Sequence, residues 1–148
     1  EHMRYLVLVS HGDFAKGLKT SLAMFAPDKM DSVIAVGLEN GKGADDFAQE
    51  FRSAMSVLKE EDDLVLLADI VGGSPLTTAL NVLNELGRYD NTVVLGGMNL
   101  PMALTMAVMK DNLSGEALKA TVLGEAKGGI QEFDTTPADA AEDEEDDI

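Results

Sequence analysis

The sequence predicts an α/β fold, with a mostly parallel central sheet and helices on both of its faces. Two observations carry this prediction. Short aliphatic runs, typical of strands buried on both faces, alternate with segments whose apolar residues recur at helical spacing. Strands that alternate with helices in this way form parallel sheets, because each helix returns the chain to the edge where the next strand begins. The 148 residues suffice for one domain with a sizeable core.

The first two strands are predicted from short apolar runs that end at glycines. Residues 4–9 are almost entirely aliphatic, and residues 32–36 form a second run that we expect Gly37 to end. Between these strands, apolar residues at helical spacing predict an amphipathic helix at 14–25, which stops before Pro27. The chain therefore begins as a strand, a helix and a second strand.

A helix and a third strand follow. Asp45 and Asp46 lie in the first turn of the helix, where acidic side chains suit the positive end of the helix dipole. Its predicted buried stripe consists of Phe47, Phe51, Met55 and Leu58. Residues 63–69 form the third strand, and its run of aliphatic residues predicts a central position in the sheet.

The second half of the chain continues the alternation. The predicted elements are a helix at 75–86 that ends at Gly87, a strand at 92–95, a helix from Pro101 to about Met109, a helix at 114–126 and a short strand at 130–133. This gives four parallel strands, plus a short C-terminal strand that we expect to be antiparallel.

Charge and composition exclude several classes of function. The net charge of −16 argues against nucleic-acid binding, which requires a basic surface. The absence of cysteine excludes disulfides, thiolate catalysis and zinc–thiolate sites, and it fits a reducing cytoplasm. No apolar run approaches the ~18 residues of a membrane span, and no secretory signal is present. We therefore expect a cytoplasmic protein.

The chain is expected to have three parts. Residues 1–2 precede Met3 and are expected to be a cloning remnant, so that His2 has no function. Residues 3–133 form the predicted domain. Residues 134–148 contain eight acidic residues and no basic one. Because such a segment cannot bury enough apolar surface to fold, we expect it to be a disordered acidic tail.

Three kinds of chemical group follow strands of the predicted sheet. His11 follows the first strand and offers an imidazole nitrogen, which is a nucleophile near neutral pH. Asp69 ends the third strand and offers a carboxylate. Gly72, Gly73 and Ser74 stand at the start of a helix, with Ser74 expected as its N-cap. Free N–H groups at a helix start favour an anion.

These groups are expected to form one site, because the carboxyl ends of parallel strands meet at the same edge of a sheet. Asp69 would accept a hydrogen bond from one ring nitrogen of His11 and leave the other free to attack an electrophile. Phosphorus is the expected electrophile, since the N–H groups suit a phosphoryl dianion. The P–N bond that forms is high in energy, so the group can be passed onward. This chemistry uses no cofactor and no metal.

Each of these features also has a purely structural interpretation. A single histidine at a strand end is more often structural than catalytic, and Asp69 could simply cap a turn. The Gly-Gly-Ser-Pro sequence is a common transition from a loop to a helix. The methionines at 98, 102, 106 and 109 are expected to fill the core rather than to form a recognition surface.

Three segments match a known family in the same order and spacing. They are residues 7–12 (VLVSHG), residues 68–75 (ADIVGGSP) and residues 97–102 (GMNLPM). On these segments the chain resembles the IIA component of the mannose family (mannose, fructose, sorbose) of the phosphoenolpyruvate-dependent sugar phosphotransferase system. The resemblance extends over residues 3–133.

The resemblance implies a specific phosphoryl relay. His11 would accept a phosphoryl group from the phosphohistidine of the carrier protein HPr and pass it to a histidine of a IIB component. The IIB component would phosphorylate a sugar brought in by the membrane components IIC and IID. Asp69 would orient the imidazole, and Ser74 with Gly72 and Gly73 would receive the phosphoryl oxygens. No IIB domain follows in this sequence, so we expect IIB on a separate chain.

The resemblance also implies a homodimer in which a C-terminal strand is exchanged between subunits. Residues 130–133 would be that strand, and the preceding pair Gly128-Gly129 would serve as a hinge. The transported sugar stays open, because its selection would belong to the membrane components.

Three alternative functions were compared with this interpretation. A receiver-like signalling domain would need an acidic pair after the first strand, where only Asp13 is present, and a lysine after a fifth strand. A histidine phosphatase would need an arginine beside His11, where Ser10 stands. A phosphotransfer subunit of a dihydroxyacetone kinase system would share the chemistry of His11. Residues 13–18 and 97–102 are more similar to the sugar-transport branch.

Overall fold

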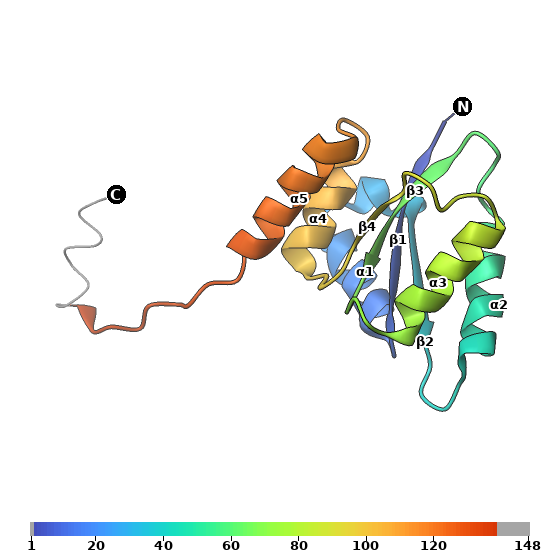
Figure 1. Cartoon of the computed structure of the whole chain (residues 1–148). Helices are drawn as coiled ribbons and strands as arrows, with labels where there is room; N and C mark the ends of the chain where they lie inside the picture. Colours follow the sequence, from blue (N-terminus) through green and yellow to red (C-terminus); the bar gives the residue numbers. More distant parts are fainter. Residues whose placement is uncertain (1, 139–148) are drawn as a thin grey trace.

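The structure is a computed structural model that describes residues 2–138 of the chain (Figure 1). In chain order the elements are β1 (Arg4–His11), α1 (Phe14–Phe25), the 3-10 helix η1 (Pro27–Ser32), β2 (Val33–Leu38), α2 (Ala44–Met55), β3 (Asp63–Ala68), α3 (Ser74–Glu85), β4 (Val93–Leu95), α4 (Leu100–Met109) and α5 (Gly115–Gly128). The predicted alternation of strands and helices is confirmed.

The four strands form one sheet in the order β2-β1-β3-β4, and every neighbouring pair is parallel. From β1 the chain moves outward to β2, and from β3 it moves outward in the opposite direction to β4. The strand order therefore reverses between β1 and β3. In open α/β sheets, ligands bind at the carboxyl ends of the strands at such a reversal.

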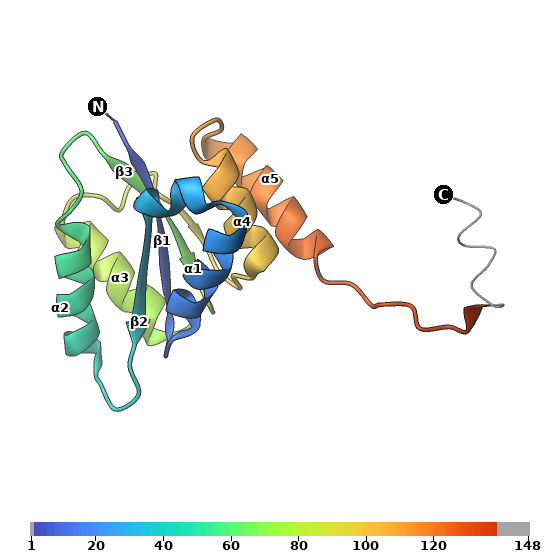
Figure 2. The same cartoon turned by 180° about the vertical axis from the view of Figure 1, so that it is seen from behind.

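Helices cover both faces of the sheet, as predicted. Leu6 and Leu8 of β1 are buried against α1, α4 and α5, whereas Val7 and Val9 are buried against α2 and α3. Figure 2 shows α1 and α4 in front of the sheet, with α2 and α3 behind or beside it. The central strand β1 is thus buried on both faces, and apolar burial of this extent is the main stabilising contribution to the fold.

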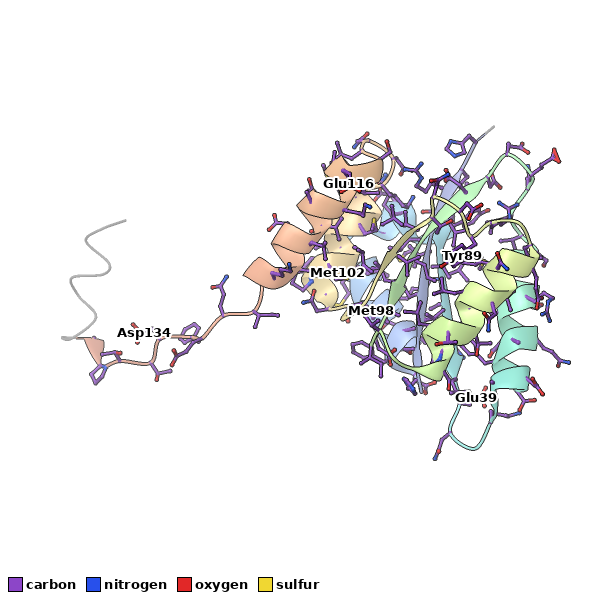
Figure 3. The ribbon with its side chains drawn as sticks, viewed as in Figure 1. Glu39, Tyr89, Met98, Met102, Glu116 and Asp134 are labelled. Atoms are coloured by element: carbon purple, nitrogen blue, oxygen red, sulfur yellow. The ribbon has the colours of Figure 1, made fainter. Side chains whose placement is uncertain are left out.

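The methionines of α4 and the loop before it fill the core, as expected. Met98, Met102 and Met106 are buried, and Met109 is partly buried against the same cluster. Figure 3 places Met98 and Met102 in the body of the molecule, in contrast to Glu39 on the loop after β2. These residues therefore act as core side chains.

Most predicted boundaries agree with the structure to within one or two residues, and the differences in β1, β2 and α2 have a clear cause. β1 continues to His11, and β2 continues past Gly37 to Leu38, because the parallel pairing of these strands continues to the His11–Leu38 pair. The backbone N–H of Gly12 then donates to the Leu38 carbonyl at 2.7 Å. At the end of α2, the helix stops at Met55, so the partly buried Leu58 lies outside the helix to which it was assigned.

Residues 130–133, predicted as a C-terminal strand exchanged between subunits, are unpaired in the single described chain. Residues 130–133 form no strand, and the side chains of Ile130 and Phe133 are 77% and 87% exposed. A strand requires a partner edge, and this segment leads away from the sheet after α5 (Figures 1 and 2). Of the predicted acidic tail, residues 134–138 are exposed, and residues 139–148 lie outside the described residues.

The N-terminal residues lie at the end of the sheet where the strands begin. His2 contacts Asp63 at the start of β3, with 3.2 Å between its Nε2 and the Asp63 Oδ1. Glu1 lies outside the described residues. Among residues 2–138, the helices are all too short or too polar to cross a membrane.

Candidate functional site

The site begins at the carboxyl ends of the two central strands. His11 is the last residue of β1, and Asp69 directly follows β3. These strands are paired up to Val9 and Ala68, and the Asp69 N–H donates to the Val9 carbonyl at 3.2 Å. The sheet thus brings together two residues that are 58 positions apart in the sequence, at the point where the strand order reverses.

The side chains of His11 and Asp69 are hydrogen-bonded to each other. The Asp69 Oδ2 lies 2.8 Å from the ring Nδ1 of His11 and also accepts the His11 backbone N–H at 2.9 Å. The other carboxylate oxygen, Oδ1, accepts the N–H of Ile70 at 2.9 Å. Because both oxygens are engaged, the carboxylate has a fixed orientation toward the ring.

These hydrogen bonds determine the charge of Asp69. Burial by itself raises the pKa of its carboxyl, but the hydrogen bonds from His11 and Ile70 outweigh this effect and hold the pKa below its ordinary value. Asp69 is therefore ionised near neutral pH and can only accept hydrogen bonds. In the neutral imidazole Nδ1 consequently carries the proton, and Nε2 presents a lone pair.

The imidazole is accessible, whereas the carboxylate is shielded. The side chain of His11 is 47% exposed and that of Asp69 is 16% exposed. The ring is thus open to solution, while the carboxylate that orients it is largely shielded from water. This is the arrangement expected of a nucleophile and its orienting group.

The glycine-rich turn provides the start of α3, with one difference from prediction. Gly73 is the N-cap, because its backbone is extended (φ −98°, ψ 164°), and Ser74 is the first residue of the helix rather than its N-cap. The N–H groups of the first helical turn lack intrahelical acceptors, and the helix dipole adds positive potential there. Gly72, Gly73 and Ser74 thus lie at a helix start that suits an anion.

The turn is in close contact with the ring. A Cβ atom built on Gly73 would lie 2.6 Å from Cε1 of His11 and 3.2 Å from its Nε2. A Cβ atom on Gly72 would meet no atom within 4 Å. The start of α3 therefore lies directly beside the edge of the imidazole that carries the free nitrogen.

Ser10 supports the site in a way that the sequence analysis missed. Its side chain is fully buried, and its hydroxyl oxygen accepts the N–H of Ala15 in the first turn of α1 at 2.7 Å. This bond fixes the turn that follows His11. A single hydroxyl residue at the end of an otherwise aliphatic strand was the available signal, since buried polar groups require partners.

Three exposed apolar side chains, which we call the apolar rim, lie in the segments that follow His11 and Asp69. Phe14 at the start of α1, and Ile70 and Val71 in the loop after β3, are each about half exposed or more. In contrast to this apolar rim, groups that bind metals are scattered: residues 2–138 contain no cluster of three or more His, Cys, Asp or Glu side chains that could hold a metal ion.

Comparisons with known proteins identify the family of this chain. The family model described as PTS system fructose IIA component matches residues 5–123. The fructose-specific EIIA component of Bacillus subtilis is 29% identical over 109 residues, which cover 74% of this chain and 72% of that protein. The mannose-specific EIIAB component of Escherichia coli is 23% identical over 92% of this chain, but the chain spans only 41% of its length.

Solved structures share the fold. The mannose/sorbose-specific IIA subunit from Enterococcus faecalis superposes with a TM-score of 0.71 at 24% identity, covering 90% of this chain and 97% of that one. Component EIIA from Streptococcus agalactiae gives 0.73 at 23% identity, with 88% and 98% coverage. Since the family model extends over most of the domain, the chain belongs to the mannose-type IIA family of the sugar phosphotransferase system, the family that its three segments resemble.

Proposed function

We propose that this protein is a cytoplasmic phosphoryl relay that accepts a phosphoryl group from phospho-HPr on His11 and passes it to a separate IIB component. The observation that carries this proposal is the 2.8 Å contact between Nδ1 of His11 and Asp69, which leaves Nε2 as the free, exposed nucleophile. Membership of the family supports a role in phosphoryl transfer for sugar uptake.

The reaction is a reversible exchange of one P–N bond for another. The lone pair of Nε2 attacks phosphorus, and the P–N bond of the donor breaks with its electron pair returning to the donor nitrogen. The proton on Nδ1 stays in its hydrogen bond to Asp69, and the carboxylate balances the positive charge that spreads over the phosphorylated ring. The phosphoryl oxygens are received by the N–H groups of Gly73 and Ser74, beside Gly72.

The surroundings of the site suit partners that are proteins. The apolar rim consists of Phe14, three residues after His11, and of Ile70 and Val71, directly after Asp69, and all three side chains are exposed. A protein surface that docks on this rim excludes water from the reacting atoms, which would otherwise compete for the phosphoryl group. Both the donor and the acceptor would use this rim in turn, because there is one reactive nitrogen for both transfers.

We further propose that the protein assembles as a homodimer by exchange of residues 130–133. The outer edge of β4 pairs with no strand of the described chain. An open groove of about 580 Å³ runs along this edge between α3 and α5, with Tyr89 and Glu116 among the residues that line it (Figure 3). The exposed Ile130 and Phe133 of a second copy supply the apolar side chains for such a strand.

The central claim is tested by incubating the protein with phosphoenolpyruvate, enzyme I and HPr and measuring its intact mass. We expect one phosphoryl group per chain, absent in His11→Ala. His2 is the only other histidine of the sequence, so His2→Ala is the matched control and should keep the full gain. A gain that survives His11→Ala, or no gain in the unaltered protein, would refute the relay.

Two further measurements separate the alternatives. Phosphohistidine is labile in acid and stable in base, whereas an aspartyl phosphate is an acyl phosphate and is also hydrolysed in base, so loss of the phosphoryl group in base would favour a receiver-like domain. Transfer from the phosphorylated protein to a IIB component supports the sugar-uptake role. Transfer only to the nucleotide bound by a dihydroxyacetone kinase would assign the protein to that system.

A further inference from the structure

A hydrogen bond holds the imidazole of His11 at only one of its two ring nitrogens. Asp69 fixes the Nδ1 corner of the ring, at 2.8 Å. The neighbouring edge of the ring, Cε1 and Nε2, carries the reactive nitrogen, and the side chain is about half exposed. An exposed side chain with one anchored corner can still swing about its χ torsions. Something must therefore limit the position of the reactive edge.

The backbone of Gly73 lies against this edge. The site where its Cβ would stand is 2.6 Å from Cε1 and 3.2 Å from Nε2 of His11, and 3.2 Å from Cδ1 of Ile70. Ordinary contacts between carbon atoms are about 3.5–4.0 Å. A side chain of any size at position 73 would thus occupy space that the imidazole now fills.

We propose that Gly73 is a positioning residue for His11: its missing side chain lets the ring lie between the Asp69 carboxylate and the start of α3. This role is distinct from donation of an N–H group to the phosphoryl oxygens, because every residue except proline keeps that N–H group. The steric role, in contrast, is lost with a single methyl group.

The size of the effect follows from the distances. Restoring a normal carbon–carbon contact requires the ring edge to move by about 1 Å. The Nδ1–Oδ2 hydrogen bond of 2.8 Å weakens steeply over such a displacement. The ring is the end of a flexible side chain, so it gives way before the backbone does. We therefore expect Gly73→Ala to fold normally and to present a displaced imidazole.

The experiment compares three alanine variants in the full chain. Gly73→Ala tests the contact. Gly72→Ala keeps the same turn and adds its methyl group in open space, outside the left-handed region of φ. Gly43→Ala controls for the loss of a glycine N-cap, since Gly43 caps α2 with an extended backbone (φ −105°, ψ 177°) and has open space around it.

The first readout is the ¹⁵N spectrum of the His11 ring, which reports the tautomer and does not depend on phosphoryl transfer. We expect the Nδ1-protonated signature in the unaltered protein, Gly72→Ala and Gly43→Ala, and its loss in Gly73→Ala. The second readout rests on the proposed function: phosphorylation of Gly73→Ala should be slower by about 100-fold, as a 1 Å misplacement of a reacting group implies, with Gly43→Ala at the normal rate.

A stability comparison completes the test. The fall in Tm caused by Gly73→Ala should be smaller in the His11→Ala background, where the colliding ring is absent and only the loss of the glycine cap and the contact with Ile70 remain. A ring spectrum in Gly73→Ala identical to that of the unaltered protein would overturn the proposal, and so would an equal fall in Tm in both backgrounds. If the unaltered protein is not phosphorylated at all, the proposed function fails, while the ring spectra still decide the role of Gly73.

Discussion

At the scale of single residues, the two ring nitrogens of His11 have different tasks because they have different neighbours. Nδ1 is bonded to a shielded carboxylate, and Nε2 lies at the exposed edge beside the start of α3. The difference between the two nitrogens depends on the negative charge of Asp69, which keeps the proton on Nδ1. A neutral group of the same shape at position 69 would remove this preference.

Asp69→Asn tests this dependence. The amide keeps the size of the side chain but has only one oxygen, and its NH₂ group can donate to Nδ1 and so favour the wrong tautomer. We expect the rate of His11 phosphorylation to fall by about 10- to 100-fold, the usual effect of losing a group that orients a histidine. The rate is measured by quenched-flow labelling, and an unchanged rate would make Asp69 a structural residue.

The same variant alters how stability depends on pH. The pKa of Asp69 is lowered in the folded protein, so its carboxylate stabilises the fold fully above the ordinary carboxyl pKa of about 4. This contribution is lost as pH falls from that value through the lowered pKa. The difference in unfolding free energy between the unaltered protein and Asp69→Asn should therefore shrink in that acidic range. A difference that is constant with pH contradicts the assignment.

Much of the residue-level site was predictable, and the reason is topological. His11 and Asp69 were assigned to one site because parallel strands end at one edge of the sheet. The contact of Gly73 with the ring and the bond from Ala15 to Ser10 were not predictable. They depend on the path of loops in space, and sequence spacing does not specify that path.

At the scale of elements, Asn99 joins two helices. Its Oδ1 accepts the N–H of Met102 at 2.8 Å and thereby caps α4, while its Nδ2 donates to the carbonyl of Ala126 near the end of α5 at 3.2 Å. One side chain thus provides a hydrogen-bond acceptor for the first turn of α4 and a donor for the last turn of α5.

Two substitutions separate these bonds. Asn99→Ala loses both and should destabilise the fold by about 1–2 kcal/mol, the usual range for an N-cap. Asn99→Asp keeps the acceptor for Met102 but loses the donor to Ala126, so its loss should be smaller. Urea unfolding followed by circular dichroism measures both values. Equal losses in the two variants would show that the cap contributes nothing.

Elements with strong periodicity were predicted closely, and those governed by neighbouring strands were not. α1 has the predicted bounds, Phe14–Phe25, because its apolar spacing is regular. β2 passes through Gly37, since pairing with β1 outweighs the weak strand preference of glycine. The short helix η1 at Pro27–Ser32 has no apolar periodicity, so no pattern in the sequence predicts it.

At the scale of the whole molecule, the fold class was predictable, but the C-terminal segment was not. The sheet and its two covered faces follow from patterns within the chain. A strand at residues 130–133 requires an edge to pair with, and within the described chain this segment pairs with none. The apolar residues of this segment are consequently exposed, as they would be in one subunit separated from its dimer.

Ile130→Ser/Phe133→Ser tests the proposed assembly. We expect the unaltered protein to sediment as a dimer at micromolar concentration and the double variant to sediment as a monomer, because the exchanged strand loses its apolar contacts. Met24→Ser is the matched control: Met24 is 84% exposed on α1, far from the edge of β4, and should leave the dimer intact. A monomeric unaltered protein, or a dimeric double variant, would rule out the exchange.

The pairing of β1 with β3, which is synthesised later, determines when the site can form during synthesis. His11 leaves the ribosome early, and Asp69 follows 58 residues later. At ordinary rates of synthesis this delay lasts several seconds. Until β3 emerges and pairs with β1, His11 has neither Asp69 nor the start of α3 beside it. A nascent or truncated chain therefore carries His11 without these neighbours, and the proposed capacity to accept a phosphoryl group arises only once β3 has paired with β1.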